Sequence, residues 1–285
     1  MISQAQFQKE IELIISNAVR EDVGEGDHSS LACIPKEAQG KAKLLVKDDG
    51  IIAGVDFAKQ VFNYIDPELK MEILIKDGER VQKRDIVFFV EGSSQSILKA
   101  ERLVLNAMQR MSAIATKTNE FVQKLEGTNT KILDTRKTTP GIRALEKWAV
   151  KIGGGENHRF ALYDMVMLKD NHIDFAGGIT QAINKTKQYL KDKGLDLKII
   201  VEARDFKEIE EILKSDGIYR ILIDNFNYEE TKQAVKLINK QCLTESSGGI
   251  TLDSVRKYAE SGVDYVSSGA LTHSIYNMDL SLKAV

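Results

Sequence analysis

The stretch Lys131–His172 reads KILDTRKTTPGIRALEKWAVKIGGGENHRFALYDMVMLKDNH, and it sets the pattern for the second half of the chain. A short apolar run, Ile132-Leu133, is followed by polar residues, a helical stretch over 141–152 and three glycines. A second apolar run over 165–168 then ends at Lys169. Apolar strands that alternate with amphipathic helices predict a parallel β/α protein. Ligands of such proteins bind beyond the carboxyl ends of the strands, where the cations of this stretch gather.

The same stretch carries an excess of positive charge. It holds eight Lys and Arg residues against five Asp and Glu residues, a net charge of +3, whereas the chain of 285 residues has a formal net charge of −2. A local positive field in a mildly acidic protein predicts a small anionic ligand and argues against binding of nucleic acid.

The overall composition is that of a soluble globular protein, with 42% hydrophobic and 29% charged residues. No apolar run approaches the ~18 residues of a membrane span, and the N-terminus lacks the order of a signal peptide. Cys33 and Cys242 lie far apart without the spacing of metal ligands. We therefore expect a cytoplasmic protein with two reduced thiols and no membrane partner.

The first part of the chain predicts a helix followed by an antiparallel sheet. We interpret Asp27-His28-Ser29 as a turn and helix cap rather than a site. Asp48-Asp49-Gly50 predicts a hairpin turn between two strands, 42–47 and 51–54. The other expected elements are helices over 3–19 and 57–65 and strands over 71–75 and 86–91.

A long helix is predicted over 100–125. Apolar residues and one threonine recur on it at spacings of four and three: Val104, Met108, Met111, Ala115, Thr118, Val122 and Leu125. Such a stripe belongs to a core or an interface, and its two methionines fill gaps rather than bind a cofactor. Arg102 lies near the start of this helix, where the dipole disfavours a cation, so it is either a solvated side chain or a functional one.

From Lys131 onward, strands and helices alternate. The expected strands are 131–135, 164–169, 197–203, 219–225, 241–246 and 264–268, and the expected helices are 141–152, 177–193, 205–214, 228–238 and 251–261. Each strand ends in polar residues: Arg136 and Lys137; Lys169; Glu202; Asp224; Ser246 to Gly249; and Ser267 to Gly269. One such residue can be a helix cap, but six successive strand ends predict one site at one edge of the sheet.

Three groups of these residues suggest separate chemistry. The small residues Ser246, Ser247, Gly248 and Gly249, with Ser267, Ser268 and Gly269, predict a phosphate site built from backbone N–H groups, or else two ordinary turns. Glu202 and Asp224 suit a hydrated Mg²⁺ carried by a diphosphate, unless each only pairs with a lysine. His158 and Arg159, with Arg136 and Lys137, suit a dicarboxylate, because guanidinium groups bind carboxylates bidentately.

The motifs AERLVLN, DTRKTTPGIRALEKWAVKIGGGENHR, LKDNH, VEA, LIDN, ESSGGI and SSGALTHS occur in this order over nearly the whole chain. Together they resemble the quinolinate phosphoribosyltransferase family. The resemblance implies an α/β fold: an incomplete parallel β/α barrel over 113–273, and an N-terminal α+β open-sandwich domain over 1–112. It also implies that the closing segment, 274–285, joins the N-terminal domain, with a strand near 278–282.

The family resemblance implies transfer of the phosphoribosyl group of phosphoribosyl pyrophosphate to quinolinate. Decarboxylation would give nicotinate mononucleotide, pyrophosphate and CO₂, in de novo NAD biosynthesis, with Mg²⁺ as cofactor. It further implies a homodimer with shared active sites, in which Arg102 reaches the partner's barrel. Assembly beyond a dimer is left open.

The resemblance also implies a role for each matching residue. Quinolinate would be surrounded by Arg102, Arg136, His158 and Arg159, and Thr135 would be a further substrate-binding residue. Lys137 and Lys169 would face the charged substrates and, with Glu202 and Asp224, carry the catalysis. Glu202 and Asp224 would hold the metal through water. The two Ser/Gly loops would bind the 5′-phosphate, with His273 adjacent. Ala113 and Ser268 depart from the family pattern, where Gly and Val are common.

Three other functions remain open, one of which is that of a close relative with a changed acceptor. Lys169 ends an apolar strand, as the carbonyl-trapping lysine of a Schiff-base aldolase does. A non-catalytic protein that binds phosphate or a dicarboxylate would also need the cationic cluster.

Overall fold

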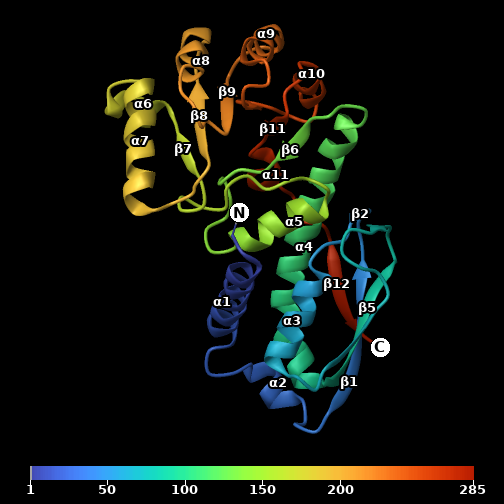
Figure 1. The fold of residues 1–285 in the computed structure, drawn as a ribbon. Helices are drawn as coiled ribbons and strands as arrows, with labels where there is room; N and C mark the ends of the chain where they lie inside the picture. The colour runs from blue at the N-terminus through green and yellow to red at the C-terminus, as the bar shows by residue number, and fades with distance from the viewer. Residues whose placement is uncertain (1) are drawn as a thin grey trace. The chain divides into compact units, whose positions relative to one another are not determined.

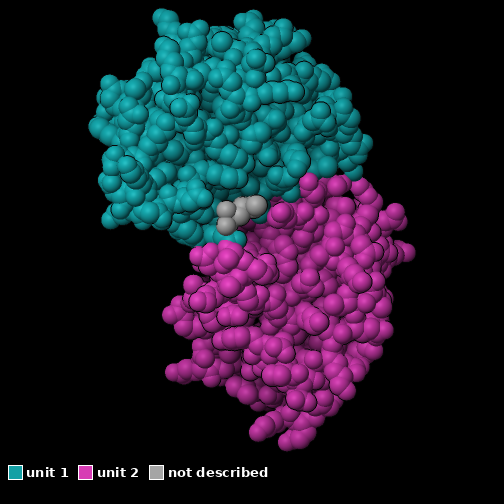
Figure 2. Space-filling view, viewed as in Figure 1, with its two compact units in different colours: residues 1–2, 120–136, 155–270 teal, residues 3–119, 137–154, 271–285 magenta. Residues whose placement is uncertain are grey.

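The computed structural model describes residues 2–285, whose ribbon is drawn in Figure 1. The chain divides into two compact units, coloured separately in Figure 2. Unit 1 consists mainly of Glu120–Arg136 and Gly155–Ala270, and unit 2 consists of Ser3–Asn119, Lys137–Gly154 and Leu271–Val285. The expected domain boundary after residue 112 falls inside one continuous helix, α4 (Ser94–Leu125), and stays a prediction.

Unit 1 contains the six strands expected from the alternating pattern. They are β6 (Lys131–Leu133), β7 (Val166–Leu168), β8 (Ile199–Ala203), β9 (Arg220–Asp224), β10 (Leu243–Ser247) and β11 (Tyr265–Ser267). The helices between them are α6 (Asp170–Ala176), α7 (Ile179–Lys193), α8 (Phe206–Ile212), α9 (Tyr228–Ile238) and α10 (Val255–Glu260). Each expected strand is confirmed, with ends shifted by at most two residues.

The six strands form one parallel sheet in the order β6-β11-β10-β9-β8-β7. Helices α7 to α10 lie along its outer side in Figure 1. All five residues of β8 are buried, as expected for a strand covered on both faces. Since β6 and β7 stand at opposite ends of the order and do not pair, the sheet is not closed, and the predicted incomplete barrel is confirmed.

Unit 2 contains an antiparallel sheet and several helices. Its strands are β1 (Gln39–Val46), β2 (Gly50–Ile51), β3 (Lys70–Ile73), β4 (Arg80–Val81), β5 (Ile86–Ser93) and β12 (Leu280–Ala284). Its helices are α1 (Gln4–Val23), α2 (His28–Cys33), α3 (Val55–Ile65), α5 (Arg143–Ile152) and most of α4, while α11 (Ala270–His273) starts at the last residue of unit 1. The main sheet has the order β12-β1-β5-β3. The predicted return of the chain end is confirmed, because β12 pairs with β1 from Ala42↔Ala284 to Val46↔Leu280.

The apolar stripe of α4 is core, as expected. Val104, Met108 and Met111 are fully buried. Gly54 has a φ of +97° and lies so close that a Cβ there would sit 3.1 Å from Met108 Cγ and from Met111 Sδ. The two methionines therefore fill the space over a glycine that no larger residue can replace without rearrangement.

The hairpin predicted from 42–47 and 51–54 is wrong. Strand β1 pairs with β5 and β12, and β2 pairs with β4 instead. Asp49 Oδ1 accepts a hydrogen bond from Lys83 N at 2.9 Å, and Asp48 Oδ2 accepts one from Asp279 N at 2.8 Å. The two aspartates thus satisfy backbone donors of distant segments rather than form a tight turn.

Two smaller expectations also have outcomes. Asp27 caps α2 by accepting hydrogen bonds from Ser29 N and Ser30 N, so the interpretation as a cap is confirmed. Helix α6 was not anticipated, because its seven residues fell within the predicted loop after Lys169.

Neither Cys33 nor Cys242 is in a disulfide. Across residues 2–285, no helix has the length and apolar character needed to cross a bilayer.

Candidate active site

The carboxyl ends of the six parallel strands meet at one edge of unit 1. Six of the predicted site residues of this unit lie there: Arg136 beyond β6, Lys169 after β7, Glu202 near the end of β8, and Asp224, Ser247 and Ser267 as the last residues of β9, β10 and β11. The parallel register explains this placement, because Ser247 pairs with Asp224 and Ser267 pairs with Leu133 at the ends of their ladders.

Glu202, Asp224 and Lys169 form an acidic centre with one cation. Lys169 Nζ lies 3.8 Å from Glu202 Oε2. Burial raises the pKa of Glu202, and the negative charge of Asp224 raises it further. Burial also raises the pKa of Asp224, while Lys169 acts in the opposite direction. Two partly desolvated carboxylates that repel each other are stabilised by a second cation, so this pair fits a divalent metal ion.

The acidic centre has too few ligands to enclose a metal by itself. In the described part of the chain, no three or more His, Cys, Asp and Glu side chains are grouped so that they could hold a metal ion. A cation held here would take its other ligands from water or from a substrate. Mg²⁺ accepts such a shell, because it retains water and binds through one or two carboxylates plus phosphate oxygens.

Arg159 and Arg136 bring two guanidinium groups together. Arg159 is buried, and its Nη1 donates to the carbonyl oxygen of Met165 at 3.3 Å. Burial lowers the pKa of Arg159, and the positive charge of Arg136 lowers it further. Because two like charges are held near each other, an anion that bridges them would be bound strongly.

His158 is fixed by protein contacts around its ring and backbone. The backbone N–H of Arg159 donates to His158 Nδ1 at 2.6 Å, and His158 N donates to buried Asp134 at 2.8 Å. With Nδ1 acting as an acceptor, the ring proton of the neutral form lies on Nε2, which faces Glu245 Oε2 at 3.2 Å. Asp134 also accepts from Asn157 Nδ2 at 2.6 Å, so it orders the segment that carries His158 and Arg159.

Glu245 and Arg220 form a buried ion pair that the sequence interpretation did not include. Arg220 Nη1 donates to Glu245 Oε2 at 2.6 Å, and both residues are almost fully buried. Burial opposes ionisation of Glu245, but His158 and Arg220 outweigh it and lower its pKa to about 2. The sequence signal was one charged residue inside each of two apolar strands, Arg220 in RILID and Glu245 in LTESS. Because side chains alternate along a strand, both of these charges lie on the inner face of the sheet.

A Glu245→Gln variant is expected to be less stable than the wild type, and its free energy of unfolding is expected to depend less on pH. The folded pKa of Glu245, about 2, lies below its ordinary 4.5. The ionised carboxylate therefore stabilises the fold above pH ~4.5, and this contribution, roughly 3 kcal/mol, is lost as the pH falls toward ~2. Removing the charge also leaves Arg220 buried without its partner, a cost of about 3–5 kcal/mol at neutral pH.

Urea unfolding of the wild type and of Glu245→Gln at pH 7 and pH 3 measures both effects. Glu260→Gln is the matched control, because its pair with Arg256 is on the surface and is worth less than ~1 kcal/mol. If Glu245→Gln lost as much stability between the two pH values as the wild type does, the pKa of Glu245 would not be lowered in the folded protein.

The Ser/Gly loops are only partly gathered at the same edge. Ser247 bonds to the Asp224 carboxylate. Ser246 faces the other side of β10, since side chains alternate along a strand. Ser268 Oγ donates to the carbonyl oxygen of Ile250 at 2.8 Å. Gly248 has a φ of +102°, and a Cβ there would come within 2.1 Å of Asn225 Oδ1, so this turn requires glycine.

Three predicted site residues belong to unit 2: Arg102, Lys137 and His273. Arg102 is exposed on α4, and its side chain has no hydrogen bond or ion pair with any residue of 2–285. Lys137 is exposed, and its carbonyl oxygen accepts a hydrogen bond from Thr272 Oγ1 at 2.8 Å. His273 is exposed, with Nδ1 2.6 Å from Ser274 Oγ.

Comparison with known proteins identifies the family. Residues 114–283 match the profile of the quinolinate phosphoribosyl transferase C-terminal domain, and residues 27–112 match that of its N-terminal domain. The chain belongs to the quinolinate phosphoribosyltransferase family. It is 45% identical over 285 residues to quinolinate phosphoribosyltransferase [decarboxylating] 1b of Nicotiana tabacum, covering 95% of this chain and 81% of the relative.

Bacterial relatives of the quinolinate phosphoribosyltransferase family match over their full length. The probable nicotinate-nucleotide pyrophosphorylase [carboxylating] of Bacillus subtilis is 39% identical over 273 residues, covering 96% of this chain and 93% of the relative. The crystal structure of NadC from Streptococcus pyogenes superposes with a TM-score of 0.89 at 36% identity, covering 100% of this chain and 99% of that one. The predicted family and the predicted fold are confirmed.

Membership of the quinolinate phosphoribosyltransferase family does not favour the Schiff-base aldolase. The geometry agrees with this, because a carbonyl-trapping lysine is desolvated or lies beside another cation. The Lys169 side chain is 50% exposed and instead lies beside the carboxylate of Glu202.

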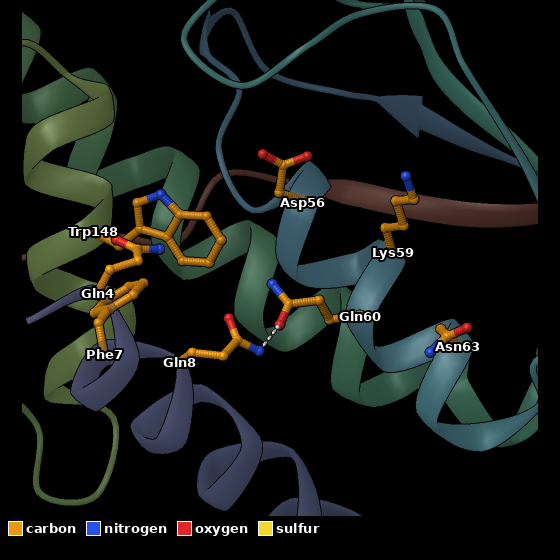
Figure 3. Close-up of a pocket in the computed structure, with 8 residues that line it drawn as sticks. All are labelled: Gln4, Phe7, Gln8, Asp56, Lys59, Gln60, Asn63 and Trp148. Atoms are coloured by element: carbon orange, nitrogen blue, oxygen red, sulfur yellow. Dashed lines mark hydrogen bonds between the residues drawn. The ribbon is translucent and has the colours of Figure 1, made fainter.

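A cavity of about 470 Å³ within unit 2 is not part of the candidate site. Figure 3 shows its lining side chains: Gln4, Phe7, Gln8, Asp56, Lys59, Gln60, Asn63 and Trp148. Gln8 donates to Gln60 at 3.0 Å, and Phe7 packs edge-on against Trp148. Trp148 lies within the motif DTRKTTPGIRALEKWAVKIGGGENHR, but none of these residues belongs to the predicted site.

Proposed function

We propose that this protein transfers the phosphoribosyl group of phosphoribosyl pyrophosphate to quinolinate with decarboxylation, giving nicotinate mononucleotide, pyrophosphate and CO₂. The proposal is supported by one observation: in a chain of this family, an arginine pair and a cluster of two carboxylates with a lysine occur at the same edge of the sheet. The arginine pair Arg136 and Arg159 suits a dicarboxylate, and the cluster of Glu202, Asp224 and Lys169 suits a metal-bound diphosphate.

The proposed mechanism needs positioning and charge neutralisation rather than a nucleophilic side chain. Arg136 and Arg159 orient quinolinate through its carboxylates, and Lys137 and Lys169 face the anionic oxygens of both substrates. Glu202 and Asp224 would hold Mg²⁺, which neutralises the charge that develops on the pyrophosphate leaving group. The pyridine nitrogen attacks the ribose carbon as the bond from that carbon to pyrophosphate breaks, and the nitrogen becomes cationic. It then stabilises the carbanion left when the adjacent carboxylate departs as CO₂, and a proton from water takes the place of that carboxylate on the ring.

We further propose that the active form is a homodimer. Arg102 is exposed on α4, and its side chain makes no hydrogen bond or ion pair with residues 2–285. A guanidinium group on the surface with no partner among residues 2–285 is available to a second subunit. In this proposal Arg102 of one subunit completes the dicarboxylate site on the barrel of the other. His273 and the Ser/Gly loops are proposed to bind the 5′-phosphate.

Incubation with quinolinate, phosphoribosyl pyrophosphate and Mg²⁺ is expected to yield nicotinate mononucleotide and equimolar CO₂ and pyrophosphate. Nicotinate should be turned over at least about 100-fold more slowly, because its single carboxylate would leave part of the cationic cluster unpaired. Chromatography of the nucleotide product and trapping of CO₂ measure both outcomes. Comparable turnover of nicotinate would contradict the dicarboxylate site. Calorimetric binding of both substrates without product would favour a non-catalytic binding protein.

A further inference from the structure

The segment Lys137–Thr139 of unit 2 is held at every residue by side chains of neighbouring elements. The contacts are Thr272 Oγ1 to Lys137 O at 2.8 Å, Arg143 Nε to Thr138 Oγ1 at 3.0 Å, and Thr139 N to Glu146 Oε2 at 3.1 Å. Two of these contacts come from α5 and one from α11. A segment that only connects two elements does not need its backbone fixed at both ends.

A buried ion pair links these contacts. Arg110 on α4 donates to Glu146 Oε1 through Nε at 3.0 Å and through Nη2 at 2.8 Å, and the Glu146 side chain is 0% exposed. Arg110 Nη2 also donates to the carbonyl oxygen of Thr272 at 2.6 Å. A buried pair gains little net stability over an apolar one, so its stability alone does not explain it. Arg110 contacts both Glu146 and Thr272, the two residues that hold the ends of Lys137–Thr139.

We propose that Arg110, Glu146 and Thr272 are positioning residues that fix the backbone of Lys137. This inference rests on the proposed function, in which the Lys137 ammonium faces the charged substrates. A lysine has a long flexible side chain, so a mobile backbone beneath it would spread the ammonium over many positions. Fixing the Lys137 carbonyl through Thr272 confines the ammonium to the range that the reaction needs.

The test is Thr272→Val, which keeps the shape of the side chain and removes the hydroxyl that donates to Lys137. We expect kcat/KM to fall about fivefold to tenfold, with activity restored by Thr272→Ser. Thr231→Val is the matched control. Thr231 is also fully buried, and its hydroxyl also donates to a backbone carbonyl, that of Asn227 at 2.7 Å, but within α9 and away from any predicted site residue. The two valine variants should melt at similar temperatures, and only Thr272→Val should lose activity.

A double-mutant cycle with Lys137→Ala separates positioning from a general loss of structure. If Thr272 acts through Lys137, Thr272→Val should lower kcat/KM in the wild type and have no further effect in Lys137→Ala. An equal fall in both backgrounds, or no fall in the wild type while Lys137→Ala is impaired, would overturn the positioning role. Full activity of Lys137→Ala would instead reject the role of Lys137 in the proposed function, whatever Thr272→Val does.

Discussion

An Asp224→Asn or Glu202→Gln variant is expected to need about 10- to 100-fold more Mg²⁺ for half-maximal activity than the wild type. Both carboxylates are partly desolvated, and each is placed where a divalent cation would offset its burial and the repulsion between them. Quinolinate affinity should change little, because the arginine pair that suits the dicarboxylate is left intact. Metal titrations of the rate and calorimetric titration with quinolinate give the two quantities.

The same substitutions are expected to raise the melting temperature of the metal-free protein by about 1 to 3 °C at pH 7. A carboxyl group whose folded pKa is raised above its ordinary value destabilises the fold when ionised, and the cost disappears as the pH falls through the folded pKa. The neutral amide removes that cost at neutral pH. If the variants are more stable but less active than the wild type, these carboxylates serve binding rather than the stability of the fold.

Asp174→Asn is the matched control for both measurements. Asp174 is an exposed carboxylate on α6 that pairs with Arg204, so its loss should alter neither the Mg²⁺ requirement nor the melting temperature appreciably. The metal assignment would be rejected by an unchanged Mg²⁺ requirement together with a large loss of quinolinate affinity in Asp224→Asn or Glu202→Gln.

The parallel half of the fold was predictable because its strands are short, apolar and separated by amphipathic helices. Stretches such as Ile199–Ala203 are buried on both faces, which requires a continuous apolar run, and the polar residue at each carboxyl end breaks that run visibly. The arrangement of Lys169, Glu202 and Asp224 at one edge then follows from parallel topology alone.

The errors arose where partners are distant in the sequence. Asp48-Asp49-Gly50 has the composition of a hairpin turn, but the strands beside it pair with β4, β5 and β12, and tertiary pairing overrode the local signal. The Glu245–Arg220 pair was missed for a related reason. Arg220 and Glu245 fell inside the expected strands 219–225 and 241–246, but the buried partner of each charge cannot be identified until the register of β9 and β10 is known.

Arg102→Ala and Lys169→Ala are each expected to be nearly inactive alone and to regain activity when refolded together. Arg102 lies on α4 in unit 2, and Lys169 follows β7 in unit 1. If Arg102 acts in the partner's site, a mixed dimer has one site with both residues intact and one site with neither. Random pairing at equal concentration makes half of the dimers mixed, so about a quarter of wild-type activity should return.

The alternative is that Arg102 is a solvated side chain or completes the site of its own subunit. Every site of a mixed dimer would then carry one substitution, and no activity would return. The dimers are followed by placing different affinity tags on the two variants and isolating the species that carries both. Arg20→Ala, at another exposed helical arginine, paired with Lys169→Ala controls for any general effect of mixing. In that pairing every wild-type-like site belongs to the Arg20→Ala subunits, which are active alone, so the rate should match the sum of the two variants. Isolated mixed dimers of Arg102→Ala and Lys169→Ala that show no more than the residual rates of the two variants would place Arg102 in its own subunit and overturn the shared site.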